Sequence, residues 1–376
     1  MRAGGNAGLR ECRKAGMPAC MNAGLREGSF SILCKGLFPR YDQDMRARAM
    51  AGKRESMNAA MPESPNARER TENFFYGGHV TTGKRLGILI AVGNQKGGVG
   101  KTTNTVHIAA ALGQRGHKSL VIDLDPAAGA TKHLGVPENS FAGSLELLST
   151  DETVESLAIT DKMPKGVHLI PSRPQLSELD TVLSKYVDRT RILDRPIALA
   201  RQQYDFIFLD TAPAAAATTT VAAYSTAEWF LLSAFPHPLS LGGLTEAFND
   251  IADVRKHRNP GLEVLGVVFT NVDGRATRLR AQLETVVHSA LPGRRFDTYI
   301  SQAVVLPDLS GRGKTLFQLP RYDKYAVAKQ YMRLAQEVEH RVTNRDAFLA
   351  GTLPPPMLVD LEGPEVEADE ALVANA

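Results

Sequence analysis

The residues of this chain that are best suited to chemistry form a glycine-rich segment with two lysines, at positions 94–103. The segment reads Asn-Gln-Lys-Gly-Gly-Val-Gly-Lys-Thr-Thr. In the common phosphate-binding loop, a glycine stands five residues before the Gly-Lys pair. Gln95 occupies that position here and Lys96 follows it, so the loop is a deviant Walker A form with an additional lysine. This pattern predicts a site for a nucleoside triphosphate.

The chemistry of phosphate binding explains the residue types in this loop. Glycines let the backbone wrap closely around a triphosphate, so that several N–H groups and the N-terminus of the next helix point at its oxygens. Lys101 is placed to neutralise the β- and γ-phosphates, and Thr102 is placed to ligate Mg²⁺. The residues expected to contact the nucleotide are Lys96, Gly97, Gly98, Val99, Gly100, Lys101, Thr102 and Thr103.

Aspartates follow two further apolar segments. Asp123 and Asp125 come directly after the apolar run 119–122, and Asp210 ends the run 206–209. A carboxylate at the carboxyl end of a parallel strand beside a phosphate-binding loop faces the phosphate crevice. Any one such aspartate could equally cap the next helix. The three together, in this order, favour a phosphate and Mg²⁺ site with Asp210 in the Walker B position.

The elements that must position these residues alternate between strands and helices. The apolar run 86–92 predicts a strand before the loop, and the helical spacing of 101–115 predicts a helix after it. The other expected strands are 119–124, 167–171, 206–210, 228–235, 264–271 and 296–301, and the other expected helices are 174–203, 241–257, 275–290 and 323–342. This alternation predicts an α/β P-loop NTPase fold, with a mostly parallel sheet that carries helices on both faces.

Composition divides the chain into three parts. Residues 1–85 hold 15 Lys/Arg against 8 Asp/Glu and show no sustained periodicity, which predicts a disordered basic extension or a translated leader ahead of a later methionine start. Residues 86–345 are expected to form the nucleotide-binding domain. Residues 346–376 contain prolines and seven acidic residues but no Lys or Arg, which predicts an acidic disordered tail.

Composition also bears on compartment and environment. No run approaches the roughly 20 apolar residues of a membrane-spanning helix, so no stable membrane association is expected. Cys12, Cys20 and Cys34 all precede residue 86, and their spacings match no usual metal pattern. This distribution favours a protein of the reduced cytoplasm over a disulfide framework.

The motifs together resemble those of the ParA/MinD-type deviant Walker A ATPases, and within them the ParA (Soj-like) chromosome and plasmid partition ATPases. The resemblance runs from about Leu86 to about Val342. It rests on the loop at 94–103, on Asp-Leu-Asp-Pro at 123–126, on Leu-Asp-Thr-Ala-Pro at 209–213, on the segment 266–275 and on the helical segment 331–338.

The resemblance implies an ATPase that uses ATP and Mg²⁺ and forms a homodimer when ATP is bound. Lys101 would hold the nucleotide of its own protomer, and Lys96 would reach across to the nucleotide of the partner. Asp125 would position or activate the attacking water. Lys96, Lys101 and Asp125 are therefore the expected catalytic residues.

The same resemblance assigns the metal and the base. Thr102 would ligate Mg²⁺, and Asp123 and Asp210 would support the metal. Asn271 follows an expected strand, and it is as good a candidate for reading the adenine edge as for an ordinary surface turn.

Three segments depart from the pattern of the family. The usual Gln-Gly-Asn is Ala-Ala-Gly at 127–129, and the usual Cys-Pro-Pro-Ser-Leu-Gly is replaced within 211–220. Both segments lie near the nucleotide or the dimer face in the family, which leaves the hydrolysis rate and the strength of dimerisation open. The usual Ile-Pro-Arg-Asn-Val-Arg-Leu reads Ile-Ser-Gln-Ala-Val-Val-Leu at 300–306, so two basic positions are lost.

Two classes of function compete. In the first, the protein is cytoplasmic and associates with the nucleoid. Its ATP-bound dimer binds DNA non-specifically, and a ParB-like centromere-binding protein stimulates hydrolysis. In the alternative, a positioning ATPase distributes a protein assembly over the nucleoid or membrane, although anionic lipid would repel the acidic C-terminus. The cargo, whether plasmid, chromosome or protein assembly, stays open. The residues expected to contact DNA are Arg275, Arg278, Arg280, Arg312, Lys314 and Arg321.

Overall fold

The computed structural model describes residues 86–137, 140–185, 188–214, 217–236, 240–275 and 277–358, so the expectations for 1–85 and 359–376 lie outside it. Within the described residues, a six-stranded sheet has the order β3-β2-β4-β1-β5-β6, and every neighbouring pair is parallel. The strands are β1 (Ile88–Gly93), β2 (Ser119–Leu124), β3 (Val167–Ile170), β4 (Phe206–Thr211), β5 (Trp229–Ala234) and β6 (Glu263–Phe269). The expected α/β fold with a parallel sheet is confirmed.

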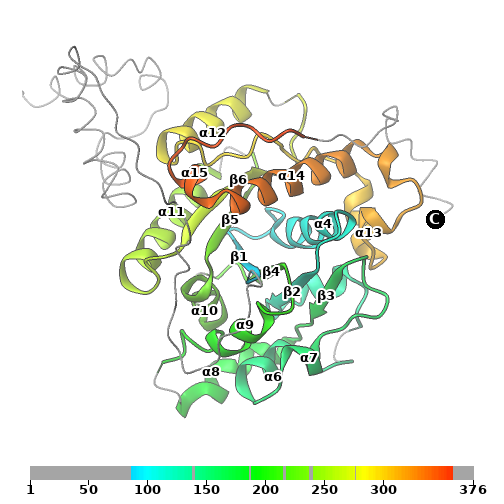
Figure 1. The fold of residues 1–376 in the computed structure, drawn as a ribbon, viewed down its shortest axis with the longest axis vertical. Helices are drawn as coiled ribbons and strands as arrows, with labels where there is room; N and C mark the ends of the chain where they lie inside the picture. Colours follow the sequence, from blue (N-terminus) through cyan, green and yellow to red (C-terminus); the bar gives the residue numbers. More distant parts are fainter. Residues whose placement is uncertain are drawn as a thin grey trace, which may run out of the picture. The chain divides into compact units, whose positions relative to one another are not determined.

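Helices cover both faces of this sheet. Figure 1 shows α4 (Lys101–Gln114) and α14 (Ala326–Thr343) on one side, and α9 (Asp194–Ala200) and α10 (Thr218–Thr226) on the other. Every residue of β2, β4 and β5 is buried, and most of them are apolar, because helices cover both faces of these strands. The uninterrupted apolar runs in the sequence have this cause.

Helix α4 is buried on nearly all sides between the sheet and α14, so its sequence is rich in alanine and carries no charged stripe. Close packing also explains Gly113 near its end. A Cβ atom there would lie 1.9 Å from the carbonyl oxygen of Lys165. The helix that follows the phosphate-binding loop is therefore held rigidly in the core.

The expected helix at 174–203 is wrong as a single element. The described part of this segment contains η1 (Pro174–Glu178), α8 (Leu179–Val182), η2 (Leu183–Lys185) and α9. Pro174 can only begin a helical turn, and Pro196 stands in the first turn of α9, where its missing N–H costs nothing. The longer helices α11 (Ser240–His257) and α12 (Thr277–Ala290) lie between β5 and α14. The short helices before α14 are α5 (Gly129–His133), α6 (Ser144–Ser149), α7 (Val154–Leu157), α13 (Val305–Gly311), η3 (Leu316–Gln318) and η4 (Tyr322–Lys324).

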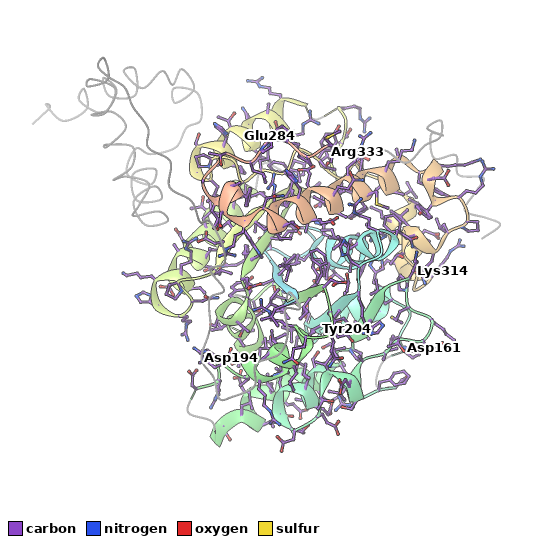
Figure 2. The ribbon with its side chains drawn as sticks, in the orientation of Figure 1. Asp161, Asp194, Tyr204, Glu284, Lys314 and Arg333 are labelled. Carbon is purple, nitrogen blue, oxygen red and sulfur yellow. The ribbon has the colours of Figure 1, made fainter. Side chains whose placement is uncertain are left out.

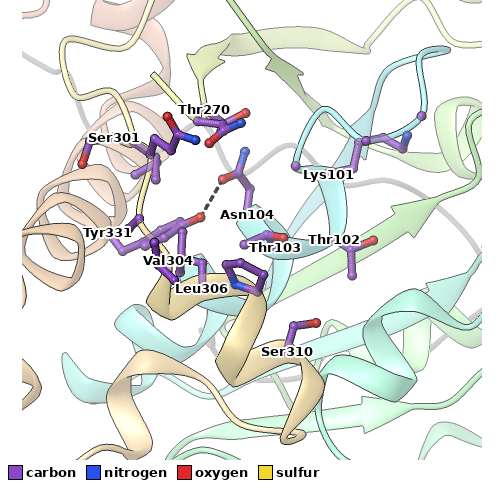
Figure 3. A pocket seen from close by; sticks show the side chains of 18 of the residues that line it. Lys101, Thr102, Thr103, Asn104, Thr270, Ser301, Val304, Leu306, Ser310 and Tyr331 are labelled. Carbon is purple, nitrogen blue, oxygen red and sulfur yellow. Dashed lines mark hydrogen bonds between the residues drawn. The ribbon is translucent and has the colours of Figure 1, made fainter. Parts of the chain in front are cut away.

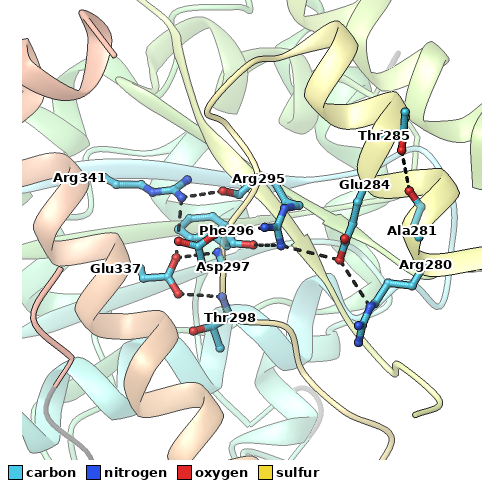
Figure 4. A network of polar contacts seen from close by, with 10 residues as sticks. All are labelled: Arg280, Ala281, Glu284, Thr285, Arg295, Phe296, Asp297, Thr298, Glu337 and Arg341. Carbon is cyan, nitrogen blue, oxygen red and sulfur yellow. Dashed lines mark hydrogen bonds and ion pairs between the residues drawn. The ribbon is translucent and has the colours of Figure 1, made fainter. Parts of the chain in front are cut away.

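The expected strand at 296–301 is also wrong. The segment touches the sheet through two isolated parallel bridges, Val267 with Arg295 and Val272 with Ser301, and through the Ile300 N–H, which donates to the Phe269 carbonyl at 2.8 Å. Between these bridges α14 supplies the missing hydrogen-bond acceptors: the Glu337 carboxylate accepts the N–H groups of Asp297 and Thr298, at 2.9 and 2.8 Å (Figure 4). Side chains therefore replace a regular strand ladder here.

The folded domain extends past the boundary expected at residue 345. Helix α15 (Arg345–Leu349) follows α14, and Phe348 is buried, with its ring under the guanidinium of Arg294 at 4.1 Å and 6.0 Å from the ring of Trp229. The acidic residues that dominated the composition of 346–376 lie almost entirely after this helix. The composition of 346–376 taken as a whole therefore did not show that its first residues are apolar.

We expect Phe348→Ala to lower the free energy of unfolding by about 3 kcal/mol, because a buried aromatic side chain is removed and a cavity remains. Urea denaturation measures this change. Met357→Ala is the control, since that side chain is 96% exposed, and it should stay within about 0.5 kcal/mol of the wild type. Equal stabilities of the two variants would show that α15 does not belong to the core.

Candidate functional site

The phosphate-binding loop joins β1 to α4 at the carboxyl end of the central strand. Gly98 and Gly100 have φ angles of 73° and 83°, which favour glycine. A Cβ atom at Gly97 or Gly98 would meet nothing within 4 Å, so this backbone faces open space. The loop can therefore approach a ligand with its N–H groups, as the sequence predicted.

Side chains around the loop fix its conformation. The Asn94 amide donates to the carbonyl of Ser233 on β5 at 2.7 Å, and its oxygen accepts the N–H of Lys96 at 2.9 Å. Gln95 donates to the Asp250 carboxylate of α11. Thr270, just after β6, donates to the carbonyl of Val99 at 2.8 Å. The backbone that carries the additional lysine is thus anchored to three different elements.

Lys101 points into a group of negative charges. Its Nζ donates to the carbonyl of Lys96 at 3.2 Å, and the side chain is almost fully buried. Burial lowers the pKa of Lys101, while the carboxylates of Asp210 and Asp125 raise it. Lys101 therefore has its charge directed at the place where a nucleotide would put phosphate.

Asp210 lies at the end of β4, directly under the loop. Its two carboxylate oxygens accept hydrogen bonds from the hydroxyls of Thr102, at 2.8 Å, and Thr105, at 3.0 Å. Burial, and then the neighbouring charge of Asp123, raise the pKa of Asp210 to about 7. A hydroxyl and a carboxylate side by side are oxygen donors of the kind that Mg²⁺ prefers, so Thr102 and Asp210 fit this cation.

Asp123 lies beside Asp210 in the register of β2 and β4, but its carboxylate is already used. One oxygen accepts both the N–H and the hydroxyl of Thr131, at 2.9 and 2.7 Å, and the other accepts the N–H of Asp125 at 3.2 Å. Burial raises the pKa of Asp123 to about 6. Both oxygens of Asp123 thus accept hydrogen bonds in this structure, as both oxygens of Asp210 do, and support of the metal by Asp123 stays a prediction.

Asp125 lines the cleft above these buried groups. One carboxylate oxygen accepts the N–H of Ala127 at 2.9 Å, and its own carbonyl accepts the N–H of Ala128 at 2.9 Å. Ala128 has a φ of 54°, a left-handed conformation that disfavours alanine. A Cβ atom at Gly129 would lie 3.1 Å from the Thr102 hydroxyl, so the glycine leaves room beside the expected metal ligand.

The loop and Asp125 open into a cleft of about 700 Å³ (Figure 3). Asn271 and Thr270 line one wall, and Asn271 is held in the left-handed region at a φ of 53°. The segment from Ile300 to Ser310 forms another wall, with Tyr331 of α14 behind it. Sequence reasoning treated 300–306 only as a segment that had lost basic residues, and no periodic signal there indicated a cleft wall.

The structure separates the six residues expected to contact DNA into two groups. Arg275, just before α12, and Arg278, in its first turn, lie exposed, and Arg275 pairs with Asp273 at 3.0 Å. Arg280 is less exposed; it pairs with Glu284 at 3.5 Å and stacks on Tyr299. The remaining three belong to the region between α13 and η4. Figure 2 shows Lys314 well apart from Glu284 of α12, toward the other end of α14. Of the second group, Arg312 pairs with Asp308 at 3.0 Å, and Lys314 and Arg321 are exposed.

No described helix has both the length and the apolar character needed to cross a membrane. No group of three or more His, Cys, Asp or Glu side chains in the described ranges could hold a metal ion by itself. A cation at Thr102 and Asp210 would thus take further oxygens from nucleotide or water, as Mg²⁺ commonly does.

Comparison with known proteins agrees with this geometry. A family described as "AAA domain" matches residues 87–264. The chromosome-partitioning ATPase Soj of Thermus thermophilus is 35% identical over 253 residues, which cover 67% of this chain and 96% of that protein. The chromosome partitioning protein ParA of Caulobacter vibrioides is 31% identical over 266 residues, which cover 70% of this chain and 97% of that protein.

A solved structure gives the same fold. Cobyrinic acid a,c-diamide synthase from Mycobacterium smegmatis, with a bound ATP analogue and magnesium, superimposes with a TM-score of 0.57 at 25% identity, covering 72% of this chain and all of that one. The identity to the partition proteins is higher and runs over nearly their whole length. The chain therefore belongs to the ParA/MinD-type family of deviant Walker A ATPases.

Proposed function

We propose that this protein is a DNA-partition ATPase. An ATP-bound dimer binds DNA without sequence preference, a ParB-like partner stimulates hydrolysis, and the monomer leaves the DNA. The observation that carries the proposal is the double-lysine loop, seated over the buried carboxylates of Asp123 and Asp210. The Soj and ParA relatives, whose names assign them to chromosome partitioning, support DNA as the cargo.

ATP with Mg²⁺ fits the site that the loop forms. The exposed backbone of Gly97 and Gly98 supplies N–H donors, and Lys101 exchanges its hydrogen bond to a carbonyl for one to phosphate. Thr102 and Asp210 hold the cation. The bound cation neutralises charge on the phosphates, and Asp125 orients the attacking water from the side of the cleft.

Lys96 is the residue that makes the dimer chemically necessary. Asn94 and Gln95 fix the backbone on both sides of it through β5 and α11. The Lys96 side chain is partly exposed, so it can project from the loop toward a second protomer. A cationic finger supplied in trans contributes roughly 10³- to 10⁵-fold to phosphoryl transfer in other enzymes. Hydrolysis thereby becomes a property of the dimer.

We expect Lys101→Ala to abolish ATP binding. Lys96→Ala should keep the Kd for ATP within about threefold of wild type but prevent dimer formation, because of the two lysines only Lys101 contacts the nucleotide of its own protomer. Titration with a non-hydrolysable ATP analogue, followed by light scattering, measures both effects. Lys165→Ala, on an exposed loop, is the control and should behave as the wild type. Equal loss of binding in the two loop variants would remove the trans role of Lys96.

The raised pKa of Asp210 predicts that protons compete with Mg²⁺. Because its pKa in the ligand-free fold is about 7, the carboxyl is largely protonated at pH 6 and must ionise to hold the cation. Binding of Mg²⁺ and ATP should therefore release protons at pH 6 and release few at pH 8. Titration calorimetry in buffers of different ionisation enthalpy counts these protons.

The same pKa sets the sign of the stability change. In the absence of ligand, ionisation of Asp210 in the unfolded chain begins near its ordinary pKa of 3.8, so this residue makes the free energy of unfolding fall as pH rises toward about 7. Asp210→Asn should remove both this slope and the proton release, while the exposed Asp161→Asn should keep them. If Asp210→Asn released as many protons as the wild type, a residue other than Asp210 would be their source.

For DNA, we expect Arg275→Ala with Arg278→Ala to weaken the binding of the ATP-bound protein to unrelated sequences equally. Each lost phosphate contact should reduce the slope of the log binding constant against the log salt concentration by about one. In a dimer each substitution removes two such contacts. Fluorescence anisotropy at several salt concentrations measures the slope. Arg195→Ala, exposed on α9 at the opposite face of the sheet, is the matched control.

Arg280 can be tested apart from Arg275 and Arg278. Arg280→Ala should alter folding stability more than DNA affinity, because Glu284 and Tyr299 already occupy its guanidinium. Binding that is equally strong without ATP would count against a patch built by the dimer. That result would assign DNA binding to the basic residues before position 86.

A further inference from the structure

Four hydrogen bonds, two of them buried and two partly buried, close a ring that holds the backbone of Asp125. On one side, the Asp125 N–H donates to an Asp123 carboxylate oxygen at 3.2 Å. On the other, the Ser172 hydroxyl donates to the carbonyl of Asp125 at 2.7 Å. Both backbone polar groups of Asp125 are therefore held by side chains, one from two residues earlier and one from a distant segment.

Thr131 completes the ring. Its hydroxyl accepts the N–H of Ser172 at 2.8 Å and donates to the second carboxylate oxygen of Asp123 at 2.7 Å. A hydroxyl has one proton, so the N–H of Ser172 and the carboxylate of Asp123 set its direction uniquely. Substitution of the hydroxyl by a methyl group would break two of the four bonds at once.

The side chains of the ring come from three separate segments and are almost completely buried. Asp123 belongs to β2, Thr131 to α5, and Ser172 to the segment after β3. Their exposed fractions are 0%, 1% and 4%. Hydrogen bonds in such a setting are strong and geometrically restrictive, because no water can replace a lost partner.

The loop that carries Asp125 requires such support. Ala128 stays at a φ of 54°, and a residue in this region persists only when its surroundings determine it. Its N–H donates to the same Asp125 carbonyl that Ser172 holds. The contacts on that carbonyl thus fix both the turn and the direction in which the Asp125 carboxylate enters the cleft.

We propose that Thr131 and Ser172 are positioning residues for hydrolysis, which act through the backbone of Asp125 and contact neither nucleotide nor metal. The inference rests on the proposed function, in which Asp125 orients the attacking water. Thr131 and Ser172 hold the Asp125 carboxylate in line with the γ-phosphate. Asp123 serves the same purpose as the acceptor that joins Thr131 to the Asp125 N–H.

The test compares Thr131→Val and Ser172→Ala with Asp125→Ala in the full chain. We expect kcat of Thr131→Val to fall by roughly 10- to 100-fold, because small displacements of a catalytic group have effects of this size. The Kd for a non-hydrolysable ATP analogue should stay within about twofold of wild type. Thr131→Ser, which keeps the hydroxyl, should restore the rate, and Ser172→Ala should lower kcat in the same way.

A double-mutant cycle separates positioning from a general structural effect. In the Asp125→Ala background, Thr131→Val should cause no further loss of rate, since the carboxylate that it positions is gone. Ser177→Ala, whose exposed hydroxyl binds only the Pro174 carbonyl in the first turn after this region, is the control and should keep the full rate. Melting temperatures of all variants with bound analogue verify that each is folded.

Three outcomes would contradict the inference. Thr131→Val and Ser172→Ala at the wild-type rate, with Asp125→Ala slow, would overturn the positioning role and leave the proposed function intact. The same fractional loss from Thr131→Val with and without Asp125 would also overturn it. A wild-type rate in Asp125→Ala would instead refute the catalytic role on which the inference rests. A folded Ser172→Ala variant keeps the test valid if Thr131→Val does not fold.

Discussion

The structure of this site depends on two carboxylates buried side by side. Asp123 and Asp210 face each other in the register of β2 and β4, and neither has any exposed surface. Like charges in a medium of low dielectric repel, and burial favours the neutral form of each group. Every carboxylate oxygen of the pair therefore accepts a hydrogen bond, from Thr102, Thr105, Thr131 or the N–H of Asp125. A cation bound beside Asp123 and Asp210 would offset the negative charge of this pair.

This constraint explains the placement of the surrounding residues. Lys101 directs its charge at Asp210 and Asp125 from the first turn of α4, and the threonines of α4 and α5 supply the hydroxyl donors. The loop lies above the same pair of carboxylates, so a cation that binds there with a nucleotide would offset their charge. The same contacts would therefore determine both the affinity for the nucleotide with its cation and the charge balance of the two carboxylates.

Sequence reasoning predicted what depends on neighbours along the chain. The six apolar strands, the loop and its two lysines follow from local patterns, and the structure has the strands within about two residues of the expected bounds. The roles of Thr131, Ser172 and Tyr331 depend on contacts between distant segments, and nothing in their local sequence shows these. The segment 296–301 does not form the expected strand, because the Ile300 N–H donates to β6 whereas those of Asp297 and Thr298 donate to Glu337 of α14.

Helix α14 links these distant parts to the nucleotide cleft. The Tyr331 hydroxyl donates to the Asn104 amide oxygen at 3.0 Å, and the Asn104 amide donates to the Ser233 hydroxyl of β5 at 2.9 Å (Figure 3 shows the first of these bonds). On the same helix, Gln330 accepts the N–H of Ser301 at 2.9 Å, beside the bonds that Glu337 accepts. One helix therefore holds both the helix behind the phosphate-binding loop and the wall of the cleft opposite it. A shift of α14 would move these two surfaces together, so the C-terminal half of the chain, which local motifs describe least, determines the shape of the nucleotide site.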